Sequence, residues 1–542
     1  MSQVVGLTVA QGVLDLGPRG RQAYRDRRAP APLIGAAMLA AALVLLPILV
    51  VIVEAAGLSA QDAIHLLVRR LIARLLVNTV GLAIAASFTC AVIGTATAWL
   101  VERTDLPGRK VWAVLAAAPL AVPPFILTYA WTSLSSALLD FAGALLVVTC
   151  AFYPLVYLPV AAALRGLDPA LEETARSLGR GPWGCFFRVV APQLRPALYG
   201  GMLLVALDTL IEFAAFQHLR YRTFTTELFA QYRTGLAGPK SSLLALVLIA
   251  LCLICVVAEL NVRGRARYAR VGSGARRIAA PVRLGLTRWP AFLALAVLTG
   301  ATLGVPLGMI AYWLLQHVEA ATTPVAPSLP LLLSATFASV GYGLAGAAAA
   351  ILLAAPLGYL TTRYPSRLSV ILERIAYLAQ GMPGIIVALA FISLTVETIR
   401  PLYQSSALLV VAYAILFLPF ALVGVRSALA QVPPGLEEAA RSLGHGWFGA
   451  TVRVLAPLAG PGVGAGAAMV FIFVETEVTA TFLLAPIGTQ TLATRFWANQ
   501  CDLAYAAGAP FAAMMVLISL FSSWLLARRF GAAVFTERLD HG

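Results

Sequence analysis

The sequence predicts an all-α polytopic membrane protein with about twelve transmembrane helices, arranged as two parallel-repeat halves of six. Of the 542 residues, 60% are hydrophobic and only 12% are charged, whereas soluble globular proteins carry roughly 25% charged residues. The apolar residues form runs of about 20, the length that a helix needs to cross the hydrocarbon layer. The basic residues cluster in short segments between these runs, as they do where they set membrane orientation.

The apolar runs are predicted to be helices, because an open strand edge would leave backbone groups unpaired in lipid. The first six runs cover residues 33–55, 75–100, 111–133, 141–164, 197–217 and 241–260. The second six cover residues 291–314, 335–360, 370–396, 405–425, 462–484 and 508–527. The third and ninth runs contain Pro119, Pro123, Pro124 and Pro383. These prolines predict kinks, which serve either a transport path or close packing.

The charge distribution predicts both the orientation and the division of the chain. Most of the 39 Lys and Arg residues fall on one side if the N-terminus is cytoplasmic, so both termini are expected there. The stretch 262–290, rich in Arg and Gly, is predicted to be a cytoplasmic linker. It separates a first half at 33–261 from a second half at 291–527, with tails at 1–32 and 528–542. Because six is even, the halves enter the membrane with the same orientation.

An internal repeat joins the two halves. Residues 171–181 are LEETARSLGRG and residues 436–446 are LEEAARSLGHG, identical at nine of eleven positions with an offset of 265. The match continues without a gap to Pro192 and Pro457. Each copy lies in a segment after the fourth span of its half. Chance is a poor explanation for such agreement between two loops.

The first copy predicts a helix, a turn and a second helix. Asp168 is an N-cap in front of the first-turn residue Pro169. Gly179 then suits a sharp turn, as Gly444 does in the second copy. A second helical stretch over residues 183–190 is expected to end at Pro192. Such a knob could dock in a groove of a partner; the alternative is an amphipathic surface helix that only caps the bundle.

At these residues the sequence resembles the EAA loop of binding-protein-dependent ABC importer permeases of type I. The matching residues are Glu173, Ala175, Gly179, Val189 and Pro192, and then Glu438, Ala440, Gly444, Val454 and Pro457. Thr174 departs from the family's alanine, and Ala191 and Ala456 depart from the leucine that usually precedes the proline. The resemblance extends over nearly the whole chain, from Asn78 to Leu526.

The resemblance implies partners for the chain. In the family, this loop inserts a coupling helix into a cytoplasmic ABC ATPase, and two similar loops imply an ATPase homodimer. Neither lysine of this chain stands in a P-loop, because Lys110 follows Arg109 and Lys240 follows Pro239. ATP and Mg²⁺ are therefore expected on the partner, with no cofactor on this chain. A periplasmic or lipid-anchored substrate-binding protein and a bacterial inner membrane are also implied, and nucleic acid is not.

The cargo is less strongly indicated. The fused twelve-span layout resembles the ferric iron permeases, with thiamine permeases as near relatives and polyamine or phosphonate as further alternatives. Four carboxylates within or beside apolar runs are candidates for a cationic path, namely Asp208, Glu212, Glu475 and Glu477. They could instead pair with a hydroxyl or an arginine to lock the bundle, and no metal ligands are assigned. An ion-coupled secondary transporter and a membrane-embedded enzyme are the other classes considered.

Overall fold

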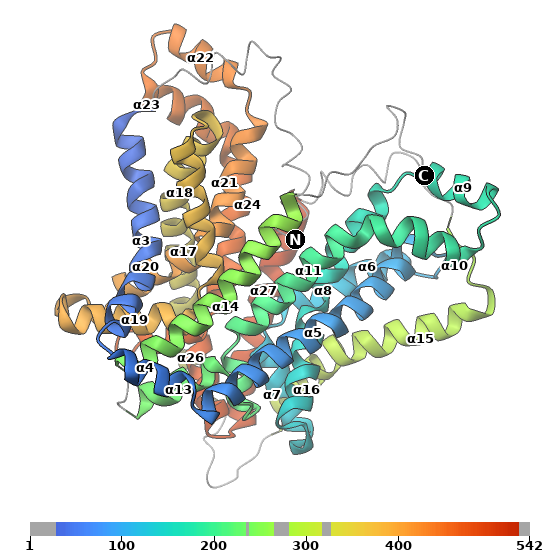
Figure 1. Ribbon diagram of the computed structural model, residues 1–542, viewed down its shortest axis with the longest axis horizontal. Helices are drawn as coiled ribbons and strands as arrows, with labels where there is room; N and C mark the ends of the chain where they lie inside the picture. The colour runs from blue at the N-terminus through green and yellow to red at the C-terminus, as the bar shows by residue number, and fades with distance from the viewer. Residues whose placement is uncertain (1–28, 235–237, 265–280, 317–326, 531–542) are drawn as a thin grey trace. The chain divides into compact units, whose positions relative to one another are not determined.

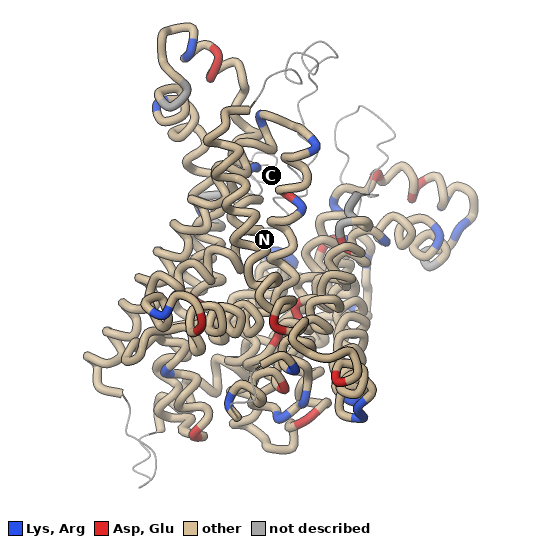
Figure 2. Tube along the Cα trace, turned by 60° about the vertical axis from the view of Figure 1, so that its left-hand side comes forward, with Lys and Arg blue, Asp and Glu red and all other residues tan. Residues whose placement is uncertain are grey.

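A computed structural model describes residues 29–234, 238–264, 281–316 and 327–530. Residues 1–28, 265–280 and 531–542, which include most of the expected tails and the middle of the expected linker, lie outside the described residues. The chain forms two compact units (Figure 1). The first unit holds residues 59–237 and 247–316, and the second holds residues 1–58, 238–246 and 317–542. Long uncharged stretches run along the helices in Figure 2, with most charged residues toward helix ends.

The described residues confirm the all-α polytopic fold. They contain nine helices long and apolar enough to cross a membrane, or up to twelve if three bent pairs count as one span each. The nine are built from α3 (Ala31–Ala55), α5 (Arg70–Arg103), α8 (Phe141–Gly166), α11 (Ala191–Ile211), α14 (Pro239–Gly264), α15 (Arg288–Thr299) continued by α16 (Val305–Leu315), α17 (Leu329–Arg363), α24 (Ala456–Glu475) and α27 (Tyr505–Phe530). The only β-structure in the described part of the chain is an isolated bridge between Thr104 and Val282.

The expected kinks are present as near right-angle breaks. A bend of 94° separates α6 (Arg109–Ala117) and its 3₁₀ extension from α7 (Pro124–Leu134). A bend of 103° separates α18 (Arg367–Leu378) from α19 (Gly384–Glu397). Val122 and Met382, which precede the prolines at 123 and 383, have extended backbones with ψ of 112° and 113°. A residue before proline is driven out of the helical region, so the helix breaks there.

A third bent pair lies in the tenth span, which the sequence predicted as one helix. There α20 (Ser406–Leu416) and α21 (Leu418–Gln431) meet at 60°. Pro419 lies in the first turn of α21, so it lacks the N–H that would continue the hydrogen bonding of α20.

Each unit also contains the first span of the other sequence half. In the second unit, α3 packs against α17, α18 and α19. In the first unit, α15 packs on α6 and α16 packs on α7. The Glu54 carboxylate of α3 accepts hydrogen bonds from Ser242 and Ser393, which joins α3 to α14 and α19. The packed units therefore differ from the two sequence halves by one exchanged span each, and by residues 238–246 at the start of α14, which belong to the second unit.

Short helices connect the spans. They are α4 (Ala60–Leu67), α9 (Pro169–Ser177), α10 (Pro182–Cys185), α12 (Ala214–His218), α13 (Phe224–Arg233), α22 (Pro434–Ser442), α23 (Trp447–Ala450), α25 (Thr479–Leu484) and α26 (Leu492–Cys501). The pairs α9–α10 and α22–α23 contain the repeated sequence. The pairs α12–α13 and α25–α26 follow α11 and α24, at the opposite ends of those helices from the repeated sequence. The two halves thus share an arrangement as well as a motif.

Glycine permits a close contact between two long helices of the first unit. A Cβ on Gly94 of α5 would lie 2.9 Å from the backbone nitrogen of Tyr157 and 3.0 Å from the carbonyl oxygen of Tyr153, both on α8. Backbone atoms cannot turn aside as a flexible side chain can. In a membrane, where lipid is as apolar as the protein, such small residues let helices approach and gain packing energy.

We therefore expect Gly94→Ala to destabilise the protein by about 1–3 kcal/mol, because the added methyl group overpacks the contact between α5 and α8. Thermal unfolding in detergent measures the effect. The matched control is Gly81→Ala on the same helix, where nothing lies within 4 Å of an added Cβ. Equal unfolding temperatures for the two variants would contradict this close contact.

Candidate functional site

The two repeated loops, residues 168–190 and 433–455, have the expected helix–turn–helix form. In the first loop, the Asp168 side chain accepts a hydrogen bond of 3.0 Å from the Ala170 N–H, which confirms the predicted N-cap of α9. In the second loop, α22 begins after Pro433 without a side-chain cap. Two prolines at its start take the place of that cap, because a proline has no N–H to satisfy.

The glycine of each loop makes the turn that ends the first helix. Gly179 has φ of +76° and Gly444 has φ of +89°, which is the left-handed region that favours glycine. The Arg180 N–H donates to the Ala175 carbonyl at 3.1 Å, and the His445 N–H donates to the Ala440 carbonyl at 3.2 Å. These bonds across six residues form a Schellman turn. In each copy of the motif, the alanine supplies the carbonyl that accepts this bond and the glycine takes the left-handed conformation. The spacing between the alanine and the glycine is therefore the spacing that the Schellman turn requires.

The second helix of each loop does not end at its proline, so the prediction that Pro192 ends it was wrong. A π-helical turn over Phe186–Val190 leads directly into α11, and the Ala191 N–H donates to the Phe186 carbonyl. Thr451–Leu455 makes the same turn before α24. A π turn shifts the hydrogen bonds by one residue, and Pro192 and Pro457 then lie in the first turn of the next helix, where no N–H is needed.

Each loop presents apolar surface to its surroundings. The Leu178 and Leu443 side chains, at equivalent positions beside the turn glycines, are 76% and 81% exposed. Glu173 and Glu438 are exposed as well, whereas Ala175 and Ala440 are buried. An exposed leucine in the same place in both loops suits a surface that another protein covers.

The predicted sites omitted the glutamates that precede Glu173 and Glu438. Glu172 and Glu437 turn inward and form ion pairs with Arg103 and Arg363, each at the C-terminal end of a long helix. The sequence does contain a signal, because both arginines follow the second span of their half. Nothing local distinguishes them from the other arginines of such segments.

Glu212 and Glu477, candidates for a cationic path, have a local structural role. The Glu212 carboxylate accepts from the Ala215 N–H at 2.9 Å, and the Glu477 carboxylate accepts from the Ala480 N–H at 2.9 Å. Each side chain thus caps the start of the short helix that follows the break, α12 or α25. The fifth and eleventh spans, predicted to continue to residues 217 and 484, break at these points. A backbone N–H is thus a partner of each carboxylate, and the Thr479 side chain also forms a hydrogen bond with Glu477.

The other two carboxylates differ from this pair and from each other. Asp208 lies one turn before Glu212 on α11 and is half-buried. Glu475 is only 5% exposed, and neither of its carboxylate oxygens has a hydrogen-bond partner among the described residues. One of these oxygens lies against Gly343 of α17. Glu475 is therefore the more exceptional group, since an ionised carboxylate without a partner is costly to bury.

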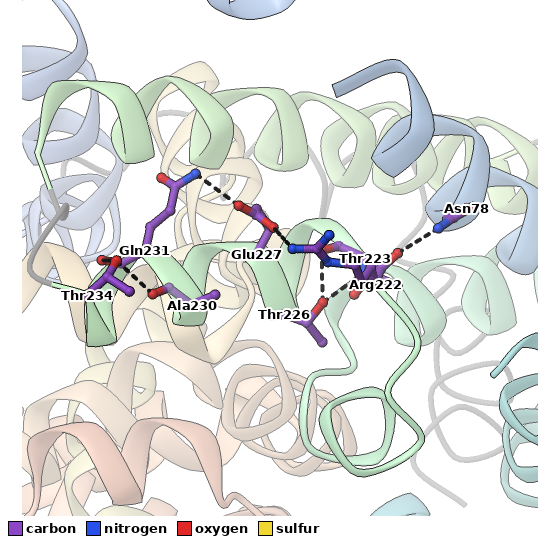
Figure 3. A network of polar contacts seen from close by, with 8 residues as sticks. All are labelled: Asn78, Arg222, Thr223, Thr226, Glu227, Ala230, Gln231 and Thr234. Atoms are coloured by element: carbon purple, nitrogen blue, oxygen red, sulfur yellow. Dashed lines mark hydrogen bonds and ion pairs between the residues drawn. The ribbon is translucent and has the colours of Figure 1, made fainter. Parts of the chain in front are cut away.

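Figure 3 shows a polar network that fixes α13 to α5 in the first unit. The Asn78 amide donates to the Arg222 carbonyl at 3.0 Å, and the Arg222 side chain lies 3.6 Å from Glu227. Thr223 and Thr226 form a capping box at the start of α13. The second unit repeats the capping box at Thr491 and Thr494 of α26.

Helices α13 and α26 are also held at equivalent places on α5 and α17. The Thr79 hydroxyl of α5 accepts from the Phe224 N–H at 3.2 Å, and the Ser339 hydroxyl of α17 accepts from the Leu492 N–H at 2.9 Å. A side-chain hydroxyl thus satisfies a first-turn N–H that the helix itself cannot pair.

The family described as binding-protein-dependent transport system inner membrane component matches the chain twice, at residues 91–265 and 350–528. The chain belongs to this family. Both matched segments contain one repeated loop, the long helix that follows it and the break after that helix. The resemblance and the two-repeat organisation inferred from the sequence are confirmed.

Individual relatives of this permease differ in how much of the chain they match. The Fe(3+)-transport system permease protein FbpB 2 of Haemophilus influenzae is 33% identical over 487 residues, which is 89% of this chain and 95% of the relative. The molybdenum transport system permease protein ModB of Escherichia coli K12 is 30% identical over 22% of this chain and 58% of its own. The sulfate transport system permease protein CysT of Escherichia coli K12 is 30% identical over 32% of this chain and 69% of its own.

The capping role of Glu477 predicts different effects for two substitutions. Glu477→Ala removes the acceptor for the Ala480 N–H and should destabilise the permease by about 1 kcal/mol. Glu477→Gln keeps a side-chain oxygen that can accept the same bond, so this variant should lose less stability than Glu477→Ala. Thermal unfolding in detergent compares the two, and the pair Glu212→Ala and Glu212→Gln repeats the comparison in the first unit. Equal losses for alanine and glutamine would argue against capping.

Proposed function

We propose that this permease moves ferric iron into the cytoplasm as the membrane-spanning subunit of a binding-protein-dependent ABC importer. The observation that carries the proposal is the match to a permease named for Fe(3+) transport over 89% of this chain and 95% of that relative. The relatives named for molybdenum and sulfate cover far less of it. Carboxylates within or beside membrane-spanning helices support a cationic cargo, because hard oxygen ligands suit a hard, highly charged cation.

ATP hydrolysis belongs, in this proposal, to a separate ABC ATPase that binds the two repeated loops. The similar turns of the two loops, each with an exposed leucine, support a partner that offers the same cleft twice, as a homodimer does. Glu173, Ala175, Gly179 and Pro192, with Glu438, Ala440, Gly444 and Pro457, are the proposed coupling residues. The contexts of Lys110 and Lys240 favour ATP and Mg²⁺ on the partner and no nucleotide on this chain.

A continuous helix links each repeated loop to the far side of the bundle. Residues 186–211 form one apolar helix, and residues 451–475 form another. At 1.5 Å per residue, each is roughly 40 Å long. The first ends at Glu212 and the second ends at Glu475, so a displacement of either loop would reach the carboxylates along a stiff element. Alternating access would follow from such displacements.

A binding protein outside the membrane would deliver the cargo. With both termini in the cytoplasm, as the basic residues favour, α13 and α26 would lie on the outer side. Arg220 and Lys240 are exposed there and are candidates for contact with an acidic binding protein. Arg222 is a weaker candidate, because its side chain already pairs with Glu227.

The test of the cargo is uptake of radioactive ferric iron by proteoliposomes that contain the permease with its ATPase and iron-loaded binding protein. We expect uptake that requires ATP and that excess thiamine does not reduce. Glu212→Gln combined with Glu477→Gln keeps both caps but removes both charges, and we expect lower uptake with unchanged recovery of the ATPase. Wild-type iron uptake by the double variant would remove these two carboxylates from the path. Thiamine uptake without iron uptake would show that thiamine, and not ferric iron, is the cargo.

The test of the repeated loops is Leu178→Asp combined with Leu443→Asp. Both leucines are exposed, so the fold should tolerate the change, whereas a charge in an apolar contact opposes docking. We expect the ATPase that co-purifies with the permease to fall by about ten-fold or more. The matched control is Leu286→Asp, an exposed leucine outside both loops. An unchanged ATPase yield with the loop variants would show that docking does not use these surfaces.

A further inference from the structure

The longest described helix of each unit ends at a buried arginine. Helix α5 has 34 residues and ends at Arg103, and α17 has 35 residues and ends at Arg363. At 1.5 Å per residue each is about 50 Å long, well beyond the roughly 30 Å hydrocarbon layer. The two arginines are nevertheless only 5% and 3% exposed. A buried guanidinium needs a partner of opposite charge.

In the second unit, that partner is the first glutamate of the repeated loop. The Arg363 Nε and Nη2 atoms both lie 2.7 Å from one Glu437 carboxylate oxygen, and the Tyr359 hydroxyl donates to the other at 2.8 Å. Arg363 also donates to the Val432 carbonyl at 2.9 Å, directly before α22 begins. A single arginine thus holds α17 to the end of α21 and to the start of the loop.

The first unit repeats the ion pair but not its hydrogen bonds, because the Arg103 Nε and Nη2 atoms and one Glu172 carboxylate oxygen have no hydrogen-bond partner among the described residues. The Arg103 Nη2 atom lies 2.9 Å from a Glu172 carboxylate oxygen. Trp99 occupies the position of Tyr359 and lacks the phenolic hydroxyl that bonds the carboxylate in the second unit. It packs instead on Phe186 of the loop, with ring centroids 4.8 Å apart. The Arg103 carbonyl accepts from the Val282 N–H at 2.7 Å, so the segment that precedes α15 is attached at the same point.

The two neighbouring glutamates of each loop therefore have different surroundings. Glu172 and Glu437 are mostly buried on arginines of the same unit, whereas Glu173 and Glu438 are exposed. The inner glutamate binds a residue of the chain itself.

We propose that the Arg103–Glu172 and Arg363–Glu437 pairs, the anchor pairs, are positioning residues that make each loop move together with the longest helix of its unit. This inference rests on the proposed function, since it assigns a route for motion from an ATPase. The helix after each loop continues into α11 or α24, and the anchor pair attaches the front of the loop to α5 or α17. A loop held at both ends transmits a displacement to two packed helices, whereas a loop held only at its back can pivot.

The test combines Glu172→Gln with Glu437→Gln in the complete complex of permease, ATPase and binding protein. Glutamine keeps the size of the side chain but loses the charge that pairs with arginine. We expect the ATPase to co-purify within about two-fold of wild type, while the ATP hydrolysed per iron delivered rises about five-fold or more. A second measurement does not depend on which cargo is transported. It compares how strongly the loaded binding protein stimulates ATP hydrolysis by the wild-type complex and by the variant complex.

The matched control is Glu102→Gln combined with Glu373→Gln, the same charge change in two ion pairs outside the repeated loops, with Arg165 of α8 and with Arg426 of α21. We expect it to leave ATP per iron at the wild-type value in the complexes that form. An equal rise with the control, an unchanged ratio with the anchor variant, or loss of the ATPase from the anchor variant would each overturn the proposal.

If the double anchor variant does not accumulate, Glu172→Gln alone, in the pair with fewer bonds, should still raise the ratio of ATP hydrolysed to iron delivered. Failure of that variant to accumulate would assign the pairs to folding alone. Absence of any ATP-driven uptake by wild type would instead count against the proposed function.

Discussion

The structure depends on one constraint, which is that a backbone N–H or carbonyl freed inside the hydrocarbon layer must find a partner within the protein. Helices meet this requirement wherever they are continuous, so the points that need explanation are the breaks. At the third and ninth spans, Pro123 and Pro383 lack the N–H that a break would leave unpaired. After the fifth and eleventh spans, Glu212 and Glu477 accept the N–H of the residue three positions later. The protein can therefore change the direction of a chain within a membrane because each break is supplied with its own polar chemistry.

The same constraint explains what the two units have in common. The shared features satisfy backbone groups: the left-handed glycine of each repeated loop, the π turn before α11 and α24, the glutamate cap and the threonine capping box at α13 and α26. These positions allow few residue types, because each needs a particular backbone angle or a particular acceptor. Side chains that only pack have more freedom, and there the two units differ. The repeat is consequently clearest in the short loops, although most of the chain lies in the spans.

Sequence reasoning succeeded where the physics is local. Span number follows from composition, and the turns at Gly179 and Gly444 follow from residues within one helical turn. It made no prediction where a distant partner decides. The exchange of α3, and of α15 with α16, between the units depends on contacts far along the chain, such as that between Glu54 and Ser393. Pro192 was expected to end a helix because the π turn that accommodates it leaves no simple pattern. The path role predicted for Glu212 stays a prediction beside its role as a cap, because a carboxylate in an apolar run has the same sequence signature whether it caps a helix or faces a cargo.

Fusion of two halves in one chain permits differences that two copies of a single-half permease could not have. The position equivalent to Glu475 is Leu210, and the position equivalent to Tyr359 is Trp99. A substitution in a symmetric dimer occurs twice, so a buried carboxylate without a partner would impose its desolvation cost twice. In a fused chain it is imposed once, while the other half keeps an apolar residue at that position. Glu475 thus breaks the internal symmetry at the end of the helix that leads from the second repeated loop. The first half has its own departure, because Asp208 has the apolar Phe473 at the equivalent position of the second half. Intramembrane carboxylates are retained chiefly where they serve function, so the two halves of the proposed path would each offer a carboxylate that the other lacks.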